Sequence, residues 1–392
     1  EISLNNDGTI DFVALEKEIL SKREIIKKTQ RWVVKIGSAL ITDKGCGLRY
    51  NVLDNWVNQI SILSDRGIEI VIVSSGAVAE GLTRLGWKNR PNVVYKLQAA
   101  AAVGQMGLIQ AYEVCFQKYN KHTAQVLLTH DDIANRTRYL NARTSLNTLL
   151  ELGVIPIVNE NDTVATDEIR FGDNDTLAGL VANLIDAELL IILTDQDGLY
   201  TSDPRENESA KLIEQAEADD EKLMDYAGDS SGHGRGGMRT KLKAASIAAR
   251  SNTETIIASG NNKSTLLEIA DGNSVGTLLT TPKKTLSSRK QWLANQSHLK
   301  GTFTLDCGAV DALKKNGKSL LPIGVKSIVG EFKRGEIVSC IDQNEKEVAR
   351  GLSNYDSTEA RLIIGKSSKD IQGLLDYVEE DEIIHRDNMI LL

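Results

Sequence analysis

Two lysines far apart in the sequence are placed where they could neutralise phosphate charge. Lys35 lies in the apolar run RWVVKIG (31–37), next to Gly37, and a buried lysine needs an anionic partner. Lys241 closes GDSSGHGRGGMRTK (228–241), which has five glycines and precedes a helical pattern. Free N–H groups of a glycine-rich loop at a helix start suit phosphate, although the ordinary P-loop motif GxxxxGK[ST] is missing. A strand-edge lysine and a surface loop remain the alternatives.

A segment rich in carboxylates and amides follows the apolar run GVIPIV. Nine of the 17 residues from Asn159 to Asp175 are Asn, Asp or Glu, with a single Arg among them. Buried carboxylates need partners, so this segment cannot be a core strand. With Lys35 and Lys241 it indicates phosphoryl transfer, in which cations hold phosphates and acids hold magnesium or an ammonium group.

Two further apolar runs end in polar side chains. SSGAVAEG (74–81) has two hydroxyls and a glycine before a helical pattern, which suits an anion or carboxylate. A simple helix cap would explain the same residues. Thr194 and Asp195 end another run where a cofactor would reach a sheet, although Thr-Asp also ends strands for reasons of turn geometry.

These side chains need a framework that brings strand ends together. Short apolar, β-branched runs lie at 31–37, 68–76, 124–129, 153–161, 187–195 and 253–260. Helical patterns separate them, for example at 93–116 and 143–152. This alternation predicts an α/β fold with a mostly parallel sheet covered by helices on both faces. Ligands bind beyond the carboxyl ends of the strands in such folds.

The pattern changes near both ends of the chain. An amphipathic pattern over 11–28 predicts a helix within an N-terminal extension, 1–30. Residues 31–282 would form the α/β domain, and the polar, basic stretch 283–300 would be a linker. The runs GTFTLDCG, SLLPIGV, RGEIVSCID, KEVARGLS and NMILL predict a small β-barrel-like domain with one or two helices. We place that domain at 301–380 and a C-terminal tail at 381–392.

Composition limits the class of protein. The 392 residues are 41% hydrophobic and 26% charged, with a net charge of −8, as expected of a globular protein in the cytoplasm. Apolar runs such as ELLIIL are too short to cross a bilayer. Four cysteines without a CxxC pair argue against a disulfide or zinc framework, and five scattered histidines without HExxH argue against a zinc hydrolase.

Longer motifs resemble one family over about residues 31–392. They are VVKIGSALIT, IVIVSSGAVAEGLTRLG, QAAAAVGQMGL, LLTHDDI, RYLNARTSLNTLL, IPIVNENDTVATDEIRFGDNDTLA, LLTDQDGLYTSDPR and GRGGMRTKLKAA. This set resembles the glutamate 5-kinases of the amino-acid kinase superfamily. GAVDALKKNGKSLLPIGVKSIVGEFKRGEIV resembles the PUA domain that many bacterial members carry. The resemblance implies transfer of the γ-phosphate of ATP to the side-chain carboxylate of L-glutamate, the first step of proline biosynthesis.

The resemblance also implies roles for individual residues. Lys35 and Lys241 would contact the transferring phosphate, and Asp175 would orient both lysines. The glutamate-binding residues would be Ser75, Gly76, Asn159, Asp162 and Asn174. The ATP-binding residues would be Lys35, Thr194, Asp195, Arg235, Gly236, Gly237, Met238, Arg239, Thr240 and Lys241. The reaction needs no general base, because the glutamate side chain is already ionised at pH 7.

The expected co-substrate is ATP with Mg²⁺, and no protein metal ligand is predicted. The resemblance further implies feedback inhibition by L-proline, a homo-oligomer (dimer or tetramer) and an association with the downstream glutamyl phosphate reductase. Two alternatives remain. One is another kinase of the superfamily, acting on carbamate or acetylglutamate; the appended β-domain argues against it. The other is an RNA-binding PUA protein, which a net charge of −4 over 301–392 disfavours.

Overall fold

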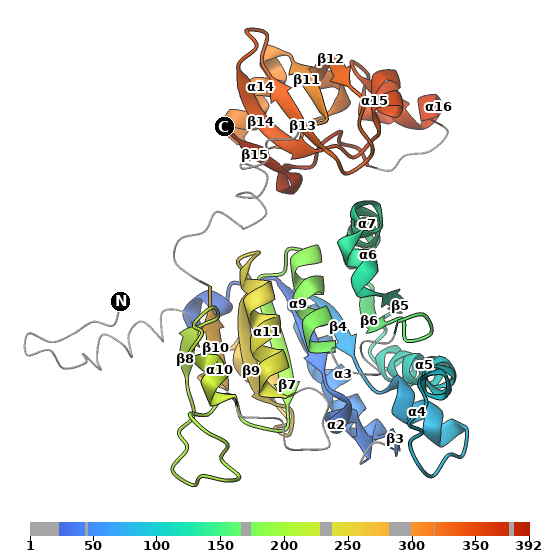
Figure 1. The fold of residues 1–392 in the computed structure, drawn as a ribbon, viewed down its shortest axis with the longest axis vertical. Coiled ribbons are helices and arrows are strands. Elements are labelled where there is room, and N and C mark those ends of the chain that lie inside the picture. Colours follow the sequence, from blue (N-terminus) through green and yellow to red (C-terminus); the bar gives the residue numbers. More distant parts are fainter. Residues whose placement is uncertain are drawn as a thin grey trace, which may run out of the picture. The chain divides into compact units, whose positions relative to one another are not determined.

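The computed structural model describes residues 23–43, 46–165, 174–227, 237–281, 299–316, 318–375 and 380–392. Two compact units are distinguished, Glu1–Ile133 with Ala142–Lys283 and Ala134–Asn141 with Lys284–Leu392 (Figure 1). Of the helix expected over 11–28, residues 11–22 lie outside the described residues, and residues 23–26 are helical. Within the described residues, no helix is long and apolar enough to cross a membrane.

The first unit is built on an eight-stranded sheet. Its strands are β1 (Arg31–Ile36), β4 (Glu69–Ser74), β5 (Thr123–Leu128), β6 (Ile155–Glu160), β7 (Leu189–Thr194), β8 (Gln215–Glu217), β9 (Glu254–Ser259) and β10 (Thr277–Thr280). Their order is β5-β6-β4-β1-β7-β9-β10-β8, and only the β9–β10 pair is antiparallel. The expected mostly parallel sheet is confirmed, and each of the six predicted runs coincides with a strand to within two residues at either end. A two-stranded hairpin of β2 (Thr42–Asp43) and β3 (Cys46–Leu48) is separate from it.

Helices cover both faces of this sheet because successive strand residues point to opposite sides. Trp32, Val34 and Ile36 pack into a core with side chains of α3 (Tyr50–Asp65) and α5 (Val94–Gln117). The helices α9 (Asn174–Leu184) and α11 (Met238–Ala249) contact the strands and each other (Figure 1). The remaining helices of the unit are α2 (Ser38–Ile41), α4 (Ala77–Arg84), α10 (Leu223–Tyr226) and α12 (Thr265–Ala270). The helices α6 (His130–Ala134) and α7 (Arg136–Glu151) belong to it except for residues Ala134–Asn141, which are assigned to the second unit. Lys35, between Val34 and Ile36, therefore points away from α3.

Two glycines allow α4 and α5 to approach backbone to backbone. A Cβ added at Gly81 would lie 1.7 Å from the carbonyl oxygen of Ala100, and one at Gly104 would lie 1.8 Å from that of Ala77. Real Cβ atoms do not reach such distances, so the two helices would have to separate. Since α4 begins directly after the β4 turn, this contact fixes the position of residues 74–76.

We expect Gly81→Ala to destabilise the protein by about 1–3 kcal/mol, because overpacking a close helix contact forces the backbone to shift. Thermal unfolding of the purified variant measures the effect. Gly373→Ala, in α16 (Ile371–Leu375) where an added Cβ meets nothing within 4 Å, is the control and should be neutral or slightly stabilising. Equal melting temperatures for Gly81→Ala and the wild type would contradict the expected clash.

The second unit has its own five-stranded sheet and core. The strand order is β12 (Val325–Gly330), β11 (Gly301–Leu305), β13 (Ile337–Ile341), β14 (Glu347–Leu352) and β15 (Met389–Leu391). Its helices are α14 (Cys307–Asn316), α15 (Ser357–Ile363) and α16, with short 3₁₀ turns at Pro322–Gly324, Ser368–Asp370 and Arg386–Asn388. Phe303 and Phe332 meet edge to face in the core, with ring centroids 5.5 Å apart.

Details of this unit differ from the sequence prediction. SLLPIGV is not a strand: Pro322 begins a 3₁₀ turn, and the unpredicted strand β12 follows it at Val325. The described residues contain three α-helices where one or two were expected. The segment 381–392, expected as a tail, contributes β15, which pairs with β14 and completes the sheet.

Candidate active site

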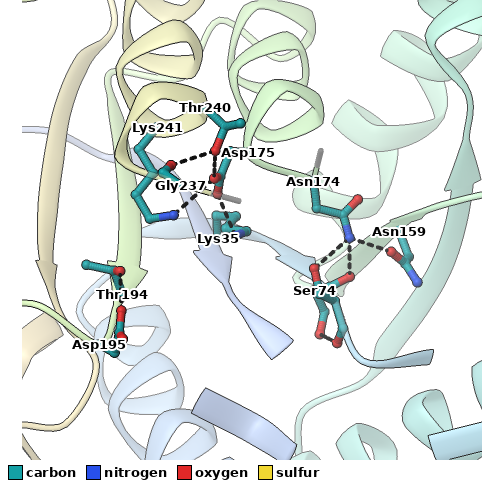
Figure 2. A network of polar contacts seen from close by, with 11 residues as sticks. Lys35, Ser74, Asn159, Asn174, Asp175, Thr194, Asp195, Gly237, Thr240 and Lys241 are labelled. Atoms are coloured by element: carbon teal, nitrogen blue, oxygen red, sulfur yellow. Dashed lines mark hydrogen bonds and ion pairs between the residues drawn. The ribbon is translucent and has the colours of Figure 1, made fainter. Parts of the chain in front are cut away.

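The polar residues singled out by the sequence gather at the carboxyl ends of adjacent strands. Lys35 of β1 pairs in register with Val73 of β4 and Ile192 of β7, so the ends of these three strands coincide. β6 follows β4 in the sheet, with Val158 beside Val73, which places Asn159 next to Ser74. Figure 2 shows the resulting contacts in two neighbouring groups, one around Asp175 and one around Asn174.

Asp175, in the first turn of α9, joins the two predicted lysines. Its Oδ1 lies 2.5 Å from Nζ of Lys35, and its Oδ2 lies 3.1 Å from Nζ of Lys241 (Figure 2). The hydroxyl of Thr240 also reaches Oδ2, at 2.6 Å, and the carbonyl of Gly237, at 2.8 Å. Asp175 is fully buried and both lysines are nearly so. The lysines, separated by 206 positions in the sequence, therefore share one buried counterion.

The electrostatics of this cluster favour an additional anion. Burial opposes ionisation of Asp175, but Lys35 and Lys241 outweigh that cost and hold the pKa of its carboxyl well below the ordinary value. Burial lowers the pKa of Lys241, and the charge of Lys35 adds to this, while Asp175 opposes it. Two cations balanced by one carboxylate leave one positive charge in a desolvated place. A phosphate group would provide the missing negative charge.

Asn174, next to Asp175, holds the neighbouring strand ends together. Its side-chain nitrogen lies 2.8 Å from the hydroxyl of Ser75, 3.2 Å from the carbonyl of Ser74 and 2.9 Å from Oδ1 of Asn159. Gly76 follows Ser75 with φ = 112°, a left-handed conformation that favours glycine, and is the N-cap residue of α4. Ser75, Gly76, Asn159 and Asn174 are thus brought together beside the lysine cluster.

Asp162 lies in the turn after β6 and faces a cleft of about 420 Å³. Its Oδ1 is buried without a hydrogen-bond partner among the described residues. Burial, reinforced by the negative charge of Glu160, raises the pKa of Asp162 to about 7, and Arg90 opposes this. A carboxyl group held at this pKa beside a second carboxylate is suited to receive a cation such as an ammonium group.

The predicted nucleotide residues lie at the other side of the lysine cluster. Thr194 ends β7, and its hydroxyl donates to the exposed Asp195 at 3.1 Å (Figure 2). Gly237 is the N-cap residue of α11, and the predicted residues Met238, Arg239, Thr240 and Lys241 form the first turn of this helix. Arg235 and Gly236 lie outside the described residues, as do residues 166–173 and 228–234.

The side chains of the site indicate how magnesium could be bound. Both oxygens of Asp175 already contact lysines, and the described part of the chain holds no group of three His, Cys, Asp or Glu residues that could bind a metal ion. Mg²⁺ often keeps its waters and binds chiefly through substrate phosphates. The site therefore fits magnesium carried by a nucleotide better than a dedicated protein cage.

Two residues of the cleft were not singled out by the sequence. Gln105 of α5 accepts a hydrogen bond from Asn159 at 2.7 Å, and Glu160 lies 3.5 Å from Nδ1 of His130. Gln105 belongs to the helical motif QAAAAVGQMGL, where a polar residue could equally face solvent. Glu160 lies within the acidic segment 159–175, but the composition of that segment does not predict a role for this residue.

The fold and the cluster of two cations around one carboxylate are typical of α/β proteins that bind phosphate groups. Comparisons with known proteins identify the family within this class. The model of the amino acid kinase family matches residues 30–259, and that of the PUA domain matches residues 301–375. A glutamate 5-kinase of Nitrosospira multiformis is 56% identical over 94% of this chain and 99% of its own. Glutamate 5-kinases of Pseudomonas syringae pv. syringae and Nitrosococcus oceani are 56% and 57% identical, each over 94% of this chain and at least 99% of theirs.

This chain belongs to the amino acid kinase family and, within it, to the glutamate 5-kinases. The match extends over both units, because the relatives cover the PUA region as well as the kinase region.

Proposed function

We propose that this protein transfers the γ-phosphate of ATP to the side-chain carboxylate of L-glutamate, giving L-glutamyl 5-phosphate. The observation that carries the proposal is the buried Lys35–Asp175–Lys241 cluster beside a cleft that contains Asp162. The names of the relatives favour glutamate over carbamate or acetylglutamate as the acceptor.

Positioning and charge neutralisation account for the chemistry. The attacking carboxylate and the γ-phosphate are both anionic, so cations must lower their repulsion as the transferred group passes between oxygens. Lys35 and Lys241 supply this charge, and Asp175 keeps their ammonium groups together. No side chain needs to remove a proton, because the nucleophile is an ionised carboxylate.

The two substrates approach from opposite sides of the lysines. Glutamate is bound by Ser75, Gly76, Asn159, Asp162 and Asn174, with Asp162 accepting its α-ammonium group. ATP is bound by Thr194, Asp195 and the loop and helix start that include residues 235–241. Mg²⁺, held by the ATP phosphates, would further neutralise their charge.

Several wider features form part of the proposal. The reaction would be the first step of proline biosynthesis in the cytoplasm, with L-proline as a feedback inhibitor. The protein would act as a dimer or tetramer and could pass its acyl phosphate to glutamyl phosphate reductase. RNA is not a proposed partner of the PUA unit, because residues 301–392 carry a net charge of −4.

A substrate comparison tests the proposed reaction. Purified protein is incubated with ATP and Mg²⁺ and with glutamate, aspartate, acetylglutamate or carbamate, and hydroxylamine traps the acyl phosphate. Hydroxamate that depends on glutamate supports the proposal. Product with another acceptor and none with glutamate would reject it.

The pKa of Asp162 predicts a pH dependence. In the free enzyme its carboxyl loses a proton near pH 7, and only the ionised form attracts an ammonium group. We therefore expect kcat/KM for glutamate to rise with pH up to about 7 and then level off. Steady-state kinetics between pH 5.5 and 8.5 measure this rise, and Asp162→Asn should flatten it.

Histidine also titrates in this range, so His130 needs its own control. In His130→Gln the rise should persist, because Asp162 remains. A rise that survives in Asp162→Asn and vanishes in His130→Gln would assign the titration to the histidine.

A further inference from the structure

A chain of amide hydrogen bonds leads from the strand ends into the cleft, and its polarity is fixed by the backbone. The N–H of Glu160 donates to Oδ1 of Asn159 at 2.9 Å, so this oxygen must be the acceptor. The nitrogen of Asn159 therefore faces Gln105 and donates to its Oε1 at 2.7 Å. Because Oε1 of Gln105 accepts this hydrogen bond, its Nε2 group, which is a donor, needs a different partner.

Nε2 of Gln105 is buried without a hydrogen-bond partner among the residues that the structure describes. The side chain belongs to a residue only 8% exposed, and it lines the same cleft as Asp162. Native proteins rarely leave a buried donor unsatisfied, because its desolvation is not repaid. A donor and an acceptor, Nε2 of Gln105 and Oδ1 of Asp162, are therefore both unsatisfied in one cleft.

This pair matches the two charged groups of an α-amino acid. The ammonium group belongs at Asp162 and Glu160, where negative charge gathers, and the α-carboxylate belongs at the neutral N–H donor. Among the described residues that line the cleft there is no lysine or arginine, so an amide is a suitable donor among them. Several of the lining side chains are apolar, namely Ala101, Ala102, Met106, Ile109 and Leu127.

We propose that Nε2 of Gln105 donates a hydrogen bond to the α-carboxylate of the amino-acid substrate and so selects α-amino acids over simple ω-amino acids. This inference rests on the proposed function, because it takes L-glutamate as the occupant of the cleft. It assigns the α5 helix a direct part in substrate binding, through a residue 54 positions before Asn159.

A pair of ligands isolates the contact. 4-Aminobutyrate keeps the carboxylate to be phosphorylated and the amine of glutamate but lacks the α-carboxylate. In Gln105→Met, a neutral change of similar size, glutamate binding should weaken about 10- to 100-fold, as for loss of a hydrogen bond to a charged group. Binding of 4-aminobutyrate should change less than about twofold, because this ligand has no α-carboxylate to accept the hydrogen bond. Titration calorimetry without ATP measures both constants.

Two more variants separate binding from positioning. Gln105→Glu keeps an oxygen for Asn159 but removes the donor, so glutamate binding should again weaken. Gln110→Met, at an exposed glutamine of the same helix, should leave both ligands unaffected. If Gln105→Met weakens glutamate and 4-aminobutyrate equally, or weakens neither, Gln105 does not bind the α-carboxylate.

The proposed function is tested separately, by the hydroxylamine assay with ATP and Mg²⁺. A wild-type protein that gives no glutamate-dependent hydroxamate would reject the proposed reaction itself. A wild type that phosphorylates glutamate, with unchanged discrimination in Gln105→Met, would reject only the role of Gln105.

Discussion

Replacing Lys241 by alanine is expected to lower kcat by about 10²–10³, with a much smaller change in the KM for glutamate. Lys241 lies 3.1 Å from Asp175, and its proposed role is to contact the transferring phosphate. Charge is redistributed there only during transfer, so the loss should fall on the transition state rather than on substrate binding. Removing one such electrostatic contact typically costs about 2.7–4 kcal/mol.

Steady-state kinetics with both substrates varied would measure this effect. Lys243→Ala is a matched control, because Lys243 is an exposed lysine two residues further along α11. A thermal unfolding curve of Lys241→Ala should accompany the kinetics, since Asp175 loses one of its two buried partners. A folded Lys241→Ala enzyme with near wild-type kcat would remove this lysine from the reaction.

The main sheet could be predicted because strands of a buried parallel sheet are continuous apolar runs. All of β1, β4, β5, β6, β7 and β9 begin and end within two residues of the predicted limits. The strands β8 and β10 were missed for a physical reason. β8 has only three residues, Gln215–Glu217, at the edge of the sheet, and too short a segment shows no periodicity.

In the second unit, strand β12 was hard to predict because it is only partly buried. In β12 the side chains of Lys326 and Ser327 are exposed while Val325 is buried, so the segment lacks the apolar run that marks β1. The apolar run SLLPIGV predicts a strand that includes Pro322. The fixed φ of proline also suits the first position of a 3₁₀ turn, which is where the structure places Pro322.

The sequence predicted the chemical types at the candidate site better than it predicted their partners. A lysine in a buried strand requires an anion, so Lys35 pointed to a charged ligand or carboxylate. The structure adds that Asp175 serves both Lys35 and Lys241, a contact that depends on how α9 and α11 pack. Gln105 could not be predicted because only the folded structure brings α5 against the end of β6.

Asp162→Asn is expected to weaken the binding of L-glutamate and of L-proline together, each by more than tenfold. Both amino acids carry an α-ammonium group, and the proposed partner of that group is the Asp162 carboxylate, whose Oδ1 is buried in the cleft and unpaired among the described residues. Loss of one charged partner from a buried pair costs about 2–5 kcal/mol. Proline lacks the side-chain carboxylate, so it should not depend on the lysine cluster.

Titration of each ligand without ATP at pH 8 decides the matter, because wild-type Asp162, with a pKa of about 7, is then largely ionised. Lys35→Ala should bind proline nearly as the wild type does, since Lys35 is assigned to the phosphate. Asp131→Asn removes an exposed carboxylate of α6 and serves as the charge-matched control. If Asp162→Asn loses glutamate but keeps wild-type affinity for proline, the two ligands do not share this carboxylate. The inhibitor would then bind at another site, and the next test would be proline binding to variants of the PUA unit.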